Sequence, residues 1–151
     1  MPTNQQPTPV GPVSAMVPRL ARAHWLVAGE LLQRVGLYPG QELLLMQLWE
    51  TDHRSQSELA KALGLDPSTV ARTVRSLEQQ GLLTRTGSPS DRRARVVSLT
   101  RAGRDLRPAV ERVWADLETI TTRDMTPRQR ADAVRLMRRM EATLQAARDD
   151  D

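Results

Sequence analysis

The segment from Ser55 to Thr100, SQSELAKALGLDPSTVARTVRSLEQQGLLTRTGSPSDRRARVVSLT, most constrains the fold of this chain of 151 residues. It begins with Ser-x-x-Glu, the capping box that starts a helix. Gly64 then ends this helix and Asp66-Pro67 begins another, because glycine tolerates a left-handed backbone and proline suits the first helical turn. Two short helices joined by a tight turn are therefore expected.

The second of these helices has two different faces. Val70, Val74 and Leu77 recur at the spacing of one buried helical stripe. Together with Ala60 and Gly64 this is the spacing of a helix-turn-helix, with a small residue where the helices cross and a glycine in the turn. The opposite face carries short hydroxyl groups and long guanidinium groups, at Ser68, Thr69, Arg72, Thr73, Arg75 and Ser76.

Two short strands follow Gly81, which ends the second helix. LLTR and RVVSLT alternate apolar and polar residues, as half-buried strands do. The connection between them, TGSPSDRRA, is rich in turn-forming residues and carries Arg92 and Arg93 near its tip. A generic two-helix hairpin would explain the apolar spacing but not this basic hairpin. Residues 55–100 are therefore predicted to form a winged helix-turn-helix.

Positive charge is concentrated on the same segment. Residues 54–104 contain ten Lys/Arg and four Asp/Glu, a net charge of +6, whereas the rest of the chain has a net charge of −2. A local positive field suits the binding of phosphate groups, although a solvated basic surface would have the same composition. The chain has no cysteine, which excludes disulfides, thiolate metal sites and thiol-based redox sensing.

Helices are predicted on both sides of this segment, so the fold class is mainly α with a small β-hairpin. Amphipathic or apolar patterns cover four ranges, 18–36, 40–52, 101–123 and 127–147. The second is apolar almost all round, which is typical of a helix at the centre of a fold. Within the third, Pro108 either kinks the helix or marks its true start.

The start of the chain differs in composition. Residues 1–17 hold four prolines and no charge, so we expect a flexible, partly polyproline-like tail. The predicted plan continues with N-terminal helices for the core and dimerisation (18–54), the winged helix-turn-helix (55–100) and C-terminal dimerisation helices (101–148).

A homodimer is expected, because the apolar stripes of the flanking helices lack a partner within one chain. No apolar run is long enough to cross a membrane, and the first 17 residues do not resemble a signal peptide. We therefore expect a cytoplasmic location.

The order of elements over residues 18–147 resembles that of the MarR family of bacterial transcriptional regulators. The most specific matches are SQSELAKALGLDPSTVARTVRSLEQQGLLTR and SDRRARVVSLTRAGR, the second of which contains the family's Asp-x-Arg wing motif as Asp91-Arg92-Arg93. The resemblance implies a winged-helix fold, a homodimer and binding to a palindromic operator, with a repressor as the expected role. Redox sensors of this family use a cysteine near the chain start, which this sequence lacks.

The resemblance also implies which residues meet double-stranded DNA. Phosphate contacts would fall on Ser55 and Gln56. The wing would supply Arg93 to the minor groove, with Asp91 holding that arginine or the wing in place and Arg92 beside it. General chemistry agrees, because arginine can bind guanine O6 and N7 with two hydrogen bonds and a wing arginine responds to groove width. Major-groove contacts would fall on the second helix, at Ser68, Thr69, Arg72, Thr73 and Arg75.

Members of this family often bind small aromatic acids or phenols between the dimer base and the DNA-binding lobe. Carried onto this chain, such a site would use His24, Trp25 and Trp49, which offer one hydrogen-bonding group and two flat apolar walls. The alternative is that both tryptophans pack in the core or the dimer interface, and that the regulator has no small-molecule ligand.

Other classes of function have less support in the sequence. An enzyme is not expected, because the chain has two histidines, no cysteine, no glycine-rich phosphate loop and no His-Glu-x-x-His motif. No cofactor or metal is expected either. A module that binds protein or RNA through the winged helix stays an alternative, but the exposed arginines of the second helix and the wing favour duplex DNA.

Overall fold

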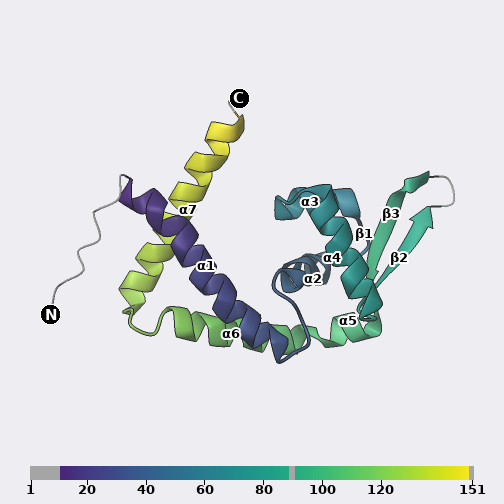
Figure 1. Ribbon diagram of the computed structural model, residues 1–151, viewed down its shortest axis with the longest axis horizontal. Coiled ribbons are helices and arrows are strands. Elements are labelled where there is room, and N and C mark those ends of the chain that lie inside the picture. The colour runs from purple at the N-terminus through teal and green to yellow at the C-terminus, as the bar shows by residue number, and fades with distance from the viewer. Residues whose placement is uncertain (1–10, 89–90, 150–151) are drawn as a thin grey trace. The chain divides into compact units, whose positions relative to one another are not determined.

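The computed structural model describes residues 11–88 and 91–149, with the backbone alone at 88 and 91–94. Two compact units make up the chain, Met1–Leu117 and Glu118–Asp151. The predicted fold class, mainly helical with a small β-sheet, is confirmed (Figure 1). The elements are, in order, α1 (Pro12–Gln33), α2 (Gln41–Glu50), β1 (Arg54–Ser55), α3 (Gln56–Leu63), α4 (Pro67–Gln79), β2 (Leu83–Ser88), β3 (Asp91–Leu99), α5 (Arg101–Asp105), α6 (Arg107–Thr121) and α7 (Pro127–Asp149).

The local signals of the helix-turn-helix act as predicted. Ser55 Oγ accepts from the Glu58 N–H at 3.1 Å, and the Glu58 carboxylate accepts from the Ser55 N–H at 3.2 Å, so the capping box starts α3. Gly64 ends α3 with a φ of 64°, in the left-handed region that glycine adopts without strain. Asp66 precedes α4, and Pro67 is its first residue.

The sheet contains one strand more than the predicted hairpin. Its order is β1-β3-β2 and all pairs are antiparallel, with Arg85 opposite Val97 and Val97 also opposite Arg54. β1 has two residues, which is too short to show an alternating pattern in the sequence. It joins the edge of β3 directly before α3, and so ties the helix-turn-helix to the hairpin.

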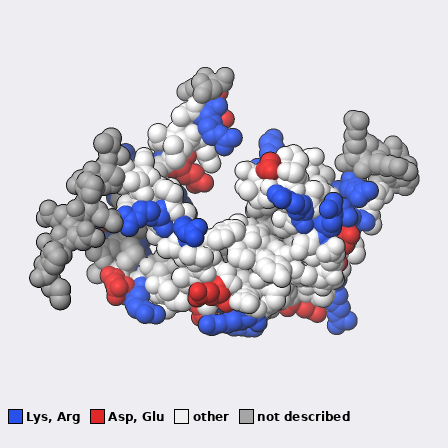
Figure 2. Space-filling model, viewed as in Figure 1, with Lys and Arg blue, Asp and Glu red and all other residues white. Residues whose placement is uncertain are grey.

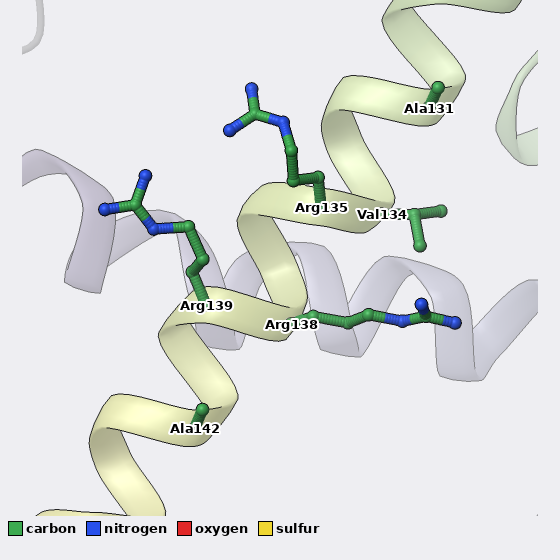
Figure 3. Close-up of a pocket in the computed structure, with 6 residues that line it drawn as sticks. All are labelled: Ala131, Val134, Arg135, Arg138, Arg139 and Ala142. Carbon is green, nitrogen blue, oxygen red and sulfur yellow. The ribbon is translucent and has the colours of Figure 1, made fainter.

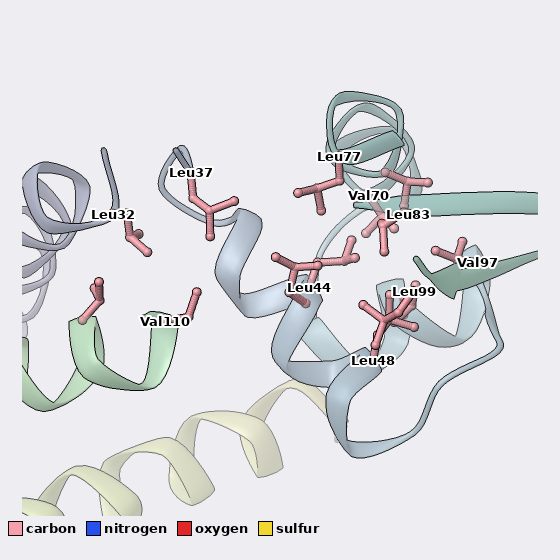
Figure 4. Close-up of a cluster of buried hydrophobic side chains, with 14 of the residues drawn as sticks. Leu32, Leu37, Leu44, Leu48, Val70, Leu77, Leu83, Val97, Leu99 and Val110 are labelled. Atoms are coloured by element: carbon pink, nitrogen blue, oxygen red, sulfur yellow. The ribbon is translucent and has the colours of Figure 1, made fainter. Parts of the chain in front are cut away.

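The hydrophobic core of the first unit is centred on α2, as its all-round apolar pattern predicted. Leu44, Leu45 and Leu48 are at most 1% exposed. The cluster also takes in α3, α4, the sheet, α1 and α6. Figure 4 shows Val70 and Leu77 of α4 and residues of β2 and β3 grouped on one side of α2, with Leu32 and Val110 on the other.

A tight junction joins the sheet to α5. The Thr100 hydroxyl accepts from the Gly103 N–H at 3.1 Å and donates to the Gly81 carbonyl at 2.7 Å. The Trp49 indole N–H donates to the Gly103 carbonyl at 3.0 Å. A Cβ at position 103 would overlap the carbonyl oxygen of Leu82, so only glycine fits here. This explains in physical terms the Leu-Thr-x-x-Gly pattern that follows the wing.

The first helix begins earlier than predicted. α1 starts at Pro12 and contains Pro18, so the prediction of a flexible tail over 1–17 is wrong for residues 12–17, and residues 1–10 lie outside the described part of the chain. Pro12 suits the first turn, whose N–H groups need no partner in the helix. Pro18 lies inside the helix and has no N–H to donate, yet α1 continues past it to Gln33. The apolar periodicity runs on through both prolines.

The segment predicted as one helix over 101–123 is two helices. α5 ends at Asp105 and α6 starts at Arg107, which places Pro108 in the first turn of α6. The structure thus selects the alternative in which Pro108 marks a helix start. In the second unit, α7 extends the predicted range 127–147 by two residues and has no buried residue. Among the described helices, none is long and apolar enough to cross a membrane.

The Gly103 junction yields a stability prediction. We expect Gly103→Ala to lower the free energy of unfolding by about 1–3 kcal/mol, the usual cost of overpacking, because the added methyl group meets the Leu82 backbone. Urea unfolding followed by circular dichroism measures this loss. Gly87→Ala is the matched control, since a Cβ there meets no atom of the described part of the chain within 4 Å. Equal stability of the two variants would contradict the prediction.

Candidate nucleic-acid interface

The outward side of α4 carries the residues that were predicted to meet the major groove. Its apolar stripe of Val70, Val74 and Leu77 is fully buried, so the opposite side faces away from the core. The structure therefore leaves two guanidinium groups and a row of hydroxyls on one open helical face. Three of the predicted residues are exposed and two are half-buried: Ser68, Arg72 and Arg75, then Thr69 and Thr73.

Ser76 does not belong to this open face, contrary to the prediction. Its Oγ accepts from Gln41 Nε2 at 2.9 Å, and Gln41 Oε1 accepts from the Tyr38 N–H at 2.9 Å. Gln41 is only 4% exposed. A buried amide needs hydrogen-bond partners, and Ser76 supplies one by turning toward α2.

The hydroxyls at the start of α4 are held by Asp66. The Asp66 carboxylate accepts from the Thr69 hydroxyl at 2.8 Å and from the Ser68 hydroxyl at 3.0 Å. These two hydrogen bonds hold the pKa of Asp66 below its usual value. Arg72 Nη2 lies 3.5 Å from Thr69 Oγ1, and the Thr73 hydroxyl donates to the Thr69 carbonyl at 2.9 Å. The N-terminal half of the helical face is thus ordered before any ligand binds.

The start of α3 lies close in sequence to this face and has a different role. Ser55 and Gln56, the predicted phosphate contacts, are both half-buried. The Ser55 oxygen is engaged by the Glu58 N–H. Its hydroxyl proton can still be donated to an acceptor such as a phosphate oxygen.

A bidentate ion pair joins the last turns of α4 to β2. The Arg85 guanidinium donates to the Glu78 carboxylate through Nε at 2.8 Å and Nη2 at 3.2 Å. This hydrogen bonding holds the pKa of Glu78 below its usual value, with smaller contributions from the charges of Arg95 and Arg75. The Arg85 side chain is only 19% exposed, so its charge is committed to Glu78.

Arg95 is a basic residue of this region that sequence reasoning did not single out. It is exposed on β3. Its positive charge, like that of Arg75, helps to lower the pKa of Glu78. The alternation of side chains along a strand could have identified Arg95 from the sequence. Arg95 lies two residues before the buried Val97 and is therefore on the same face of the sheet. Figure 2 shows basic side chains gathered over α4 and the adjoining strands.

The predicted wing contacts Asp91, Arg92 and Arg93 lie in the N-terminal part of β3 by their backbone. Their side chains lie outside the described residues. The strand pairing nevertheless places this end of β3 at the tip of the hairpin, with Ser88 opposite Asp91.

The three residues predicted to line a ligand site have three different surroundings. The ring of His24 meets the ring of Trp114 edge-on, with 6.5 Å between centroids. Trp49 packs against the core and is bonded to Gly103. Trp25 is 48% exposed and its ring reaches Gly40, at the start of α2. Trp49 is thus a packing residue, in line with the alternative interpretation, whereas His24 and Trp25 keep accessible ring surface.

A shallow groove lies on α7, in the second unit. Sequence reasoning predicted no binding site there. In Figure 3, Arg135 and Arg139 extend to one side of the helix and Arg138 to the other, and the remaining lining residues are alanine or valine. None of the predicted ligand residues lines it. The full lining is Ala131, Val134, Arg135, Arg138, Arg139 and Ala142.

Known proteins resemble this chain in sequence. A model of the MarR family matches residues 37–94, which include α2, α3 and α4. The organic hydroperoxide resistance transcriptional regulator of Bacillus subtilis (strain 168) is 36% identical over 73 residues, 48% of this chain and 50% of that relative. The chain thus spans about half the length of this curated relative.

Solved structures match over more of the chain. A MarR transcriptional regulator from Methanosarcina mazei Go1 has a TM-score of 0.79 at 27% identity, covering 89% of this chain and 97% of that chain. Bordetella bronchiseptica BpsR has a TM-score of 0.76 at 26% identity, covering 85% and 92%.

The matches agree with the predicted family and with the prediction that the chain is not an enzyme. In sequence they fall on the helix-turn-helix, and in structure they extend to most of the helices outside it. Residues 37–94 thus match the MarR family, and the chain has the fold of MarR-type transcriptional regulators.

Proposed function

We propose that this chain binds a palindromic DNA operator as a homodimer and acts as a repressor of transcription. The open face of α4 carries the proposal, because it presents Arg72 and Arg75 beside ordered hydroxyl groups and next to a basic sheet. An α-helix fits the major groove of B-DNA, and arginine pairs with guanine there. The repressor role is supported by the family resemblance.

Each predicted residue has a role in this proposal. On α4, base edges are contacted by Ser68, Thr69, Arg72 and Arg75, with Thr73 behind them. Ser55 and Gln56 donate to phosphates from the start of α3. In the wing, Arg93 enters the minor groove, and Asp91 and Arg92 support it. Binding to DNA is supported by the similar protein BpsR, whose DNA binding is regulated.

DNA binding is tested by sequencing the duplex fragments that the purified chain retains. We expect two half-sites about one helical turn apart, as two-fold helix-turn-helix dimers require. The logarithm of the binding constant should fall linearly with the logarithm of salt concentration, because each phosphate contact releases counterions. Fluorescence anisotropy measures this slope. A flat salt response, or equally tight binding of structured RNA, would argue for a different class of partner.

The homodimer is supported by apolar side chains that stay exposed on α1 and on α7. On α1, Val13, Met16, Val17 and Leu20 recur at helical spacing and are each more than half exposed. On α7, Leu136, Met137 and Leu144 are exposed to a similar degree. Burying such surfaces against a second copy is favourable by about 25 cal/mol per Å² of apolar area.

Light scattering tests the oligomeric state. We expect about twice the mass of one chain at micromolar concentration. Val17→Asp should shift the distribution toward the monomer, because it places a charge in the apolar stripe of α1. Leu65→Asp, at an exposed apolar position of the helix-turn-helix turn, is the matched control and should stay dimeric. A wild-type chain with the mass of a monomer would contradict the homodimer.

We also propose that a small aromatic acid releases the DNA. In the similar protein BpsR, 6-hydroxynicotinic acid regulates DNA binding. In this chain, Trp25 supplies exposed ring surface and His24 a half-buried imidazole one residue away. A ligand shifts such an equilibrium only by the difference of its affinities for the two states.

The ligand proposal is tested by titrating salicylate-like acids while following tryptophan fluorescence and the release of bound duplex. We expect quenching and release to occur at the same concentrations, and both to weaken in His24→Ala and Trp25→Leu. Trp114→Leu reports whether the signal comes from the neighbouring ring instead. If no acid in the panel releases the duplex, the chain is a regulator without this kind of ligand.

A further inference from the structure

The sheet directs two arginines toward α4, and only one of them is neutralised. On β2, Leu83 is buried and Arg85 lies two residues on; on β3, Arg95 lies two residues before the buried Val97. Since side chains alternate across a strand, all four lie on the core-facing side. Arg85 and Val97 are directly opposite each other, so Arg95 lies farther out, toward the tip of the hairpin.

The position opposite Arg95 leaves room around its side chain. Arg95 is paired with Gly87, and a Cβ at Gly87 would have no described residue within 4 Å. Arg85 forms the bidentate pair with Glu78. Arg95 is exposed and forms no ion pair with another described residue. One arginine of the pair is thus structural, and the other presents a free positive charge.

Helical geometry places Arg75 on the same side. A step of three residues turns an α-helix by about 300°, so each step falls about 60° short of a full turn. Arg72, Arg75 and Glu78 therefore swing progressively from the open face toward the sheet, where Glu78 meets Arg85. Arg75 lies between the face that carries Arg72 and the contact with β2. Like Arg95, it is exposed and lies within electrostatic reach of Glu78.

We propose that Arg75 and Arg95 bind one stretch of the DNA phosphate backbone from α4 and β3, and that Arg75 is a phosphate contact instead of a base contact. The inference rests on the proposed function and revises one of its residues. Because Glu78 is neutralised by Arg85, the two free guanidinium groups leave a net positive pair facing outward. Guanidinium groups bind phosphate oxygens through two parallel hydrogen bonds.

The experiment compares Arg75→Gln, Arg95→Gln and Arg72→Gln by fluorescence anisotropy. The probes are the duplex recovered by sequencing and a set of its single-base-pair variants, each at several salt concentrations. Arg75→Gln and Arg95→Gln should each reduce the magnitude of the log–log salt slope by about 0.9, the value for one lost phosphate contact. Both should weaken all duplexes by the same factor. Arg72→Gln should instead relax the preference at one base pair.

Arg101→Gln is the matched control, because it removes the same charge from an exposed position on α5. Thermal unfolding confirms that all variants are folded. A slope for Arg95→Gln equal to that of Arg101→Gln would overturn the assignment, and so would a base-pair-specific loss in Arg75→Gln. If the wild-type chain retains no duplex at all, the proposed function itself fails and the assignment with it. These outcomes are separate measurements and cannot be confused.

Discussion

The burial of α2 is the constraint on which the first unit depends. Leu44, Leu45 and Leu48 are almost completely buried, and full burial of one such side chain is worth about 1.5–3 kcal/mol. The helix contacts α3, α4 and β3, so it sets how the helix-turn-helix and the sheet face each other. At the C-terminal end of α2, the hydrogen bond from the Trp49 indole to the Gly103 carbonyl also joins α2 to α5.

The other end of α2 places polar groups inside the structure. The Glu42 carboxylate, 4% exposed, accepts from the Gly40 N–H at 2.8 Å, and burial raises its pKa against the effect of such hydrogen bonds. Beside it, Gln41 reaches Ser76 of α4. The junction between α1 and α2 and the last turn of α4 therefore share one hydrogen-bonded network. A displacement at that junction cannot leave α4 unaffected, because the buried amide would lose its partners.

An acidic residue lies near each end of α4. Asp66 holds the hydroxyls at the start of the helix, and Glu78 is paired with Arg85 near its end. Each carboxylate is engaged by hydrogen bonds that stabilise its charged form. On α4 and the described part of β3, Arg72, Arg75 and Arg95 are exposed and take part in no ion pair with another described residue. This separates Arg72, on the open face of α4, from Arg75 and Arg95, which lie toward the sheet.

Local signals in the sequence determined most of the helix-turn-helix. The capping box at Ser55, the left-handed Gly64 and the Asp66-Pro67 start depend on a few neighbouring residues, and each appears in the structure as predicted. The buried stripe of α4 follows equally from its period. Helix starts near prolines were harder, because Pro12 and Pro18 both satisfy local rules for a first turn, and the structure starts α1 at Pro12.

Contacts between residues far apart in the sequence were decided by the tertiary structure alone. Strand β1 exists because Arg54 and Ser55 meet β3, and Ser76 turns inward because Gln41 lies across from it. Trp49 is held in place by the hydrogen bond from its indole N–H to the carbonyl of Gly103, 54 residues away. Composition showed that the segment is basic, but the pairing of Arg85 with Glu78 decided which arginines stay free. A sequence specifies which groups can pair, whereas the partner of each group depends on which elements the core brings together.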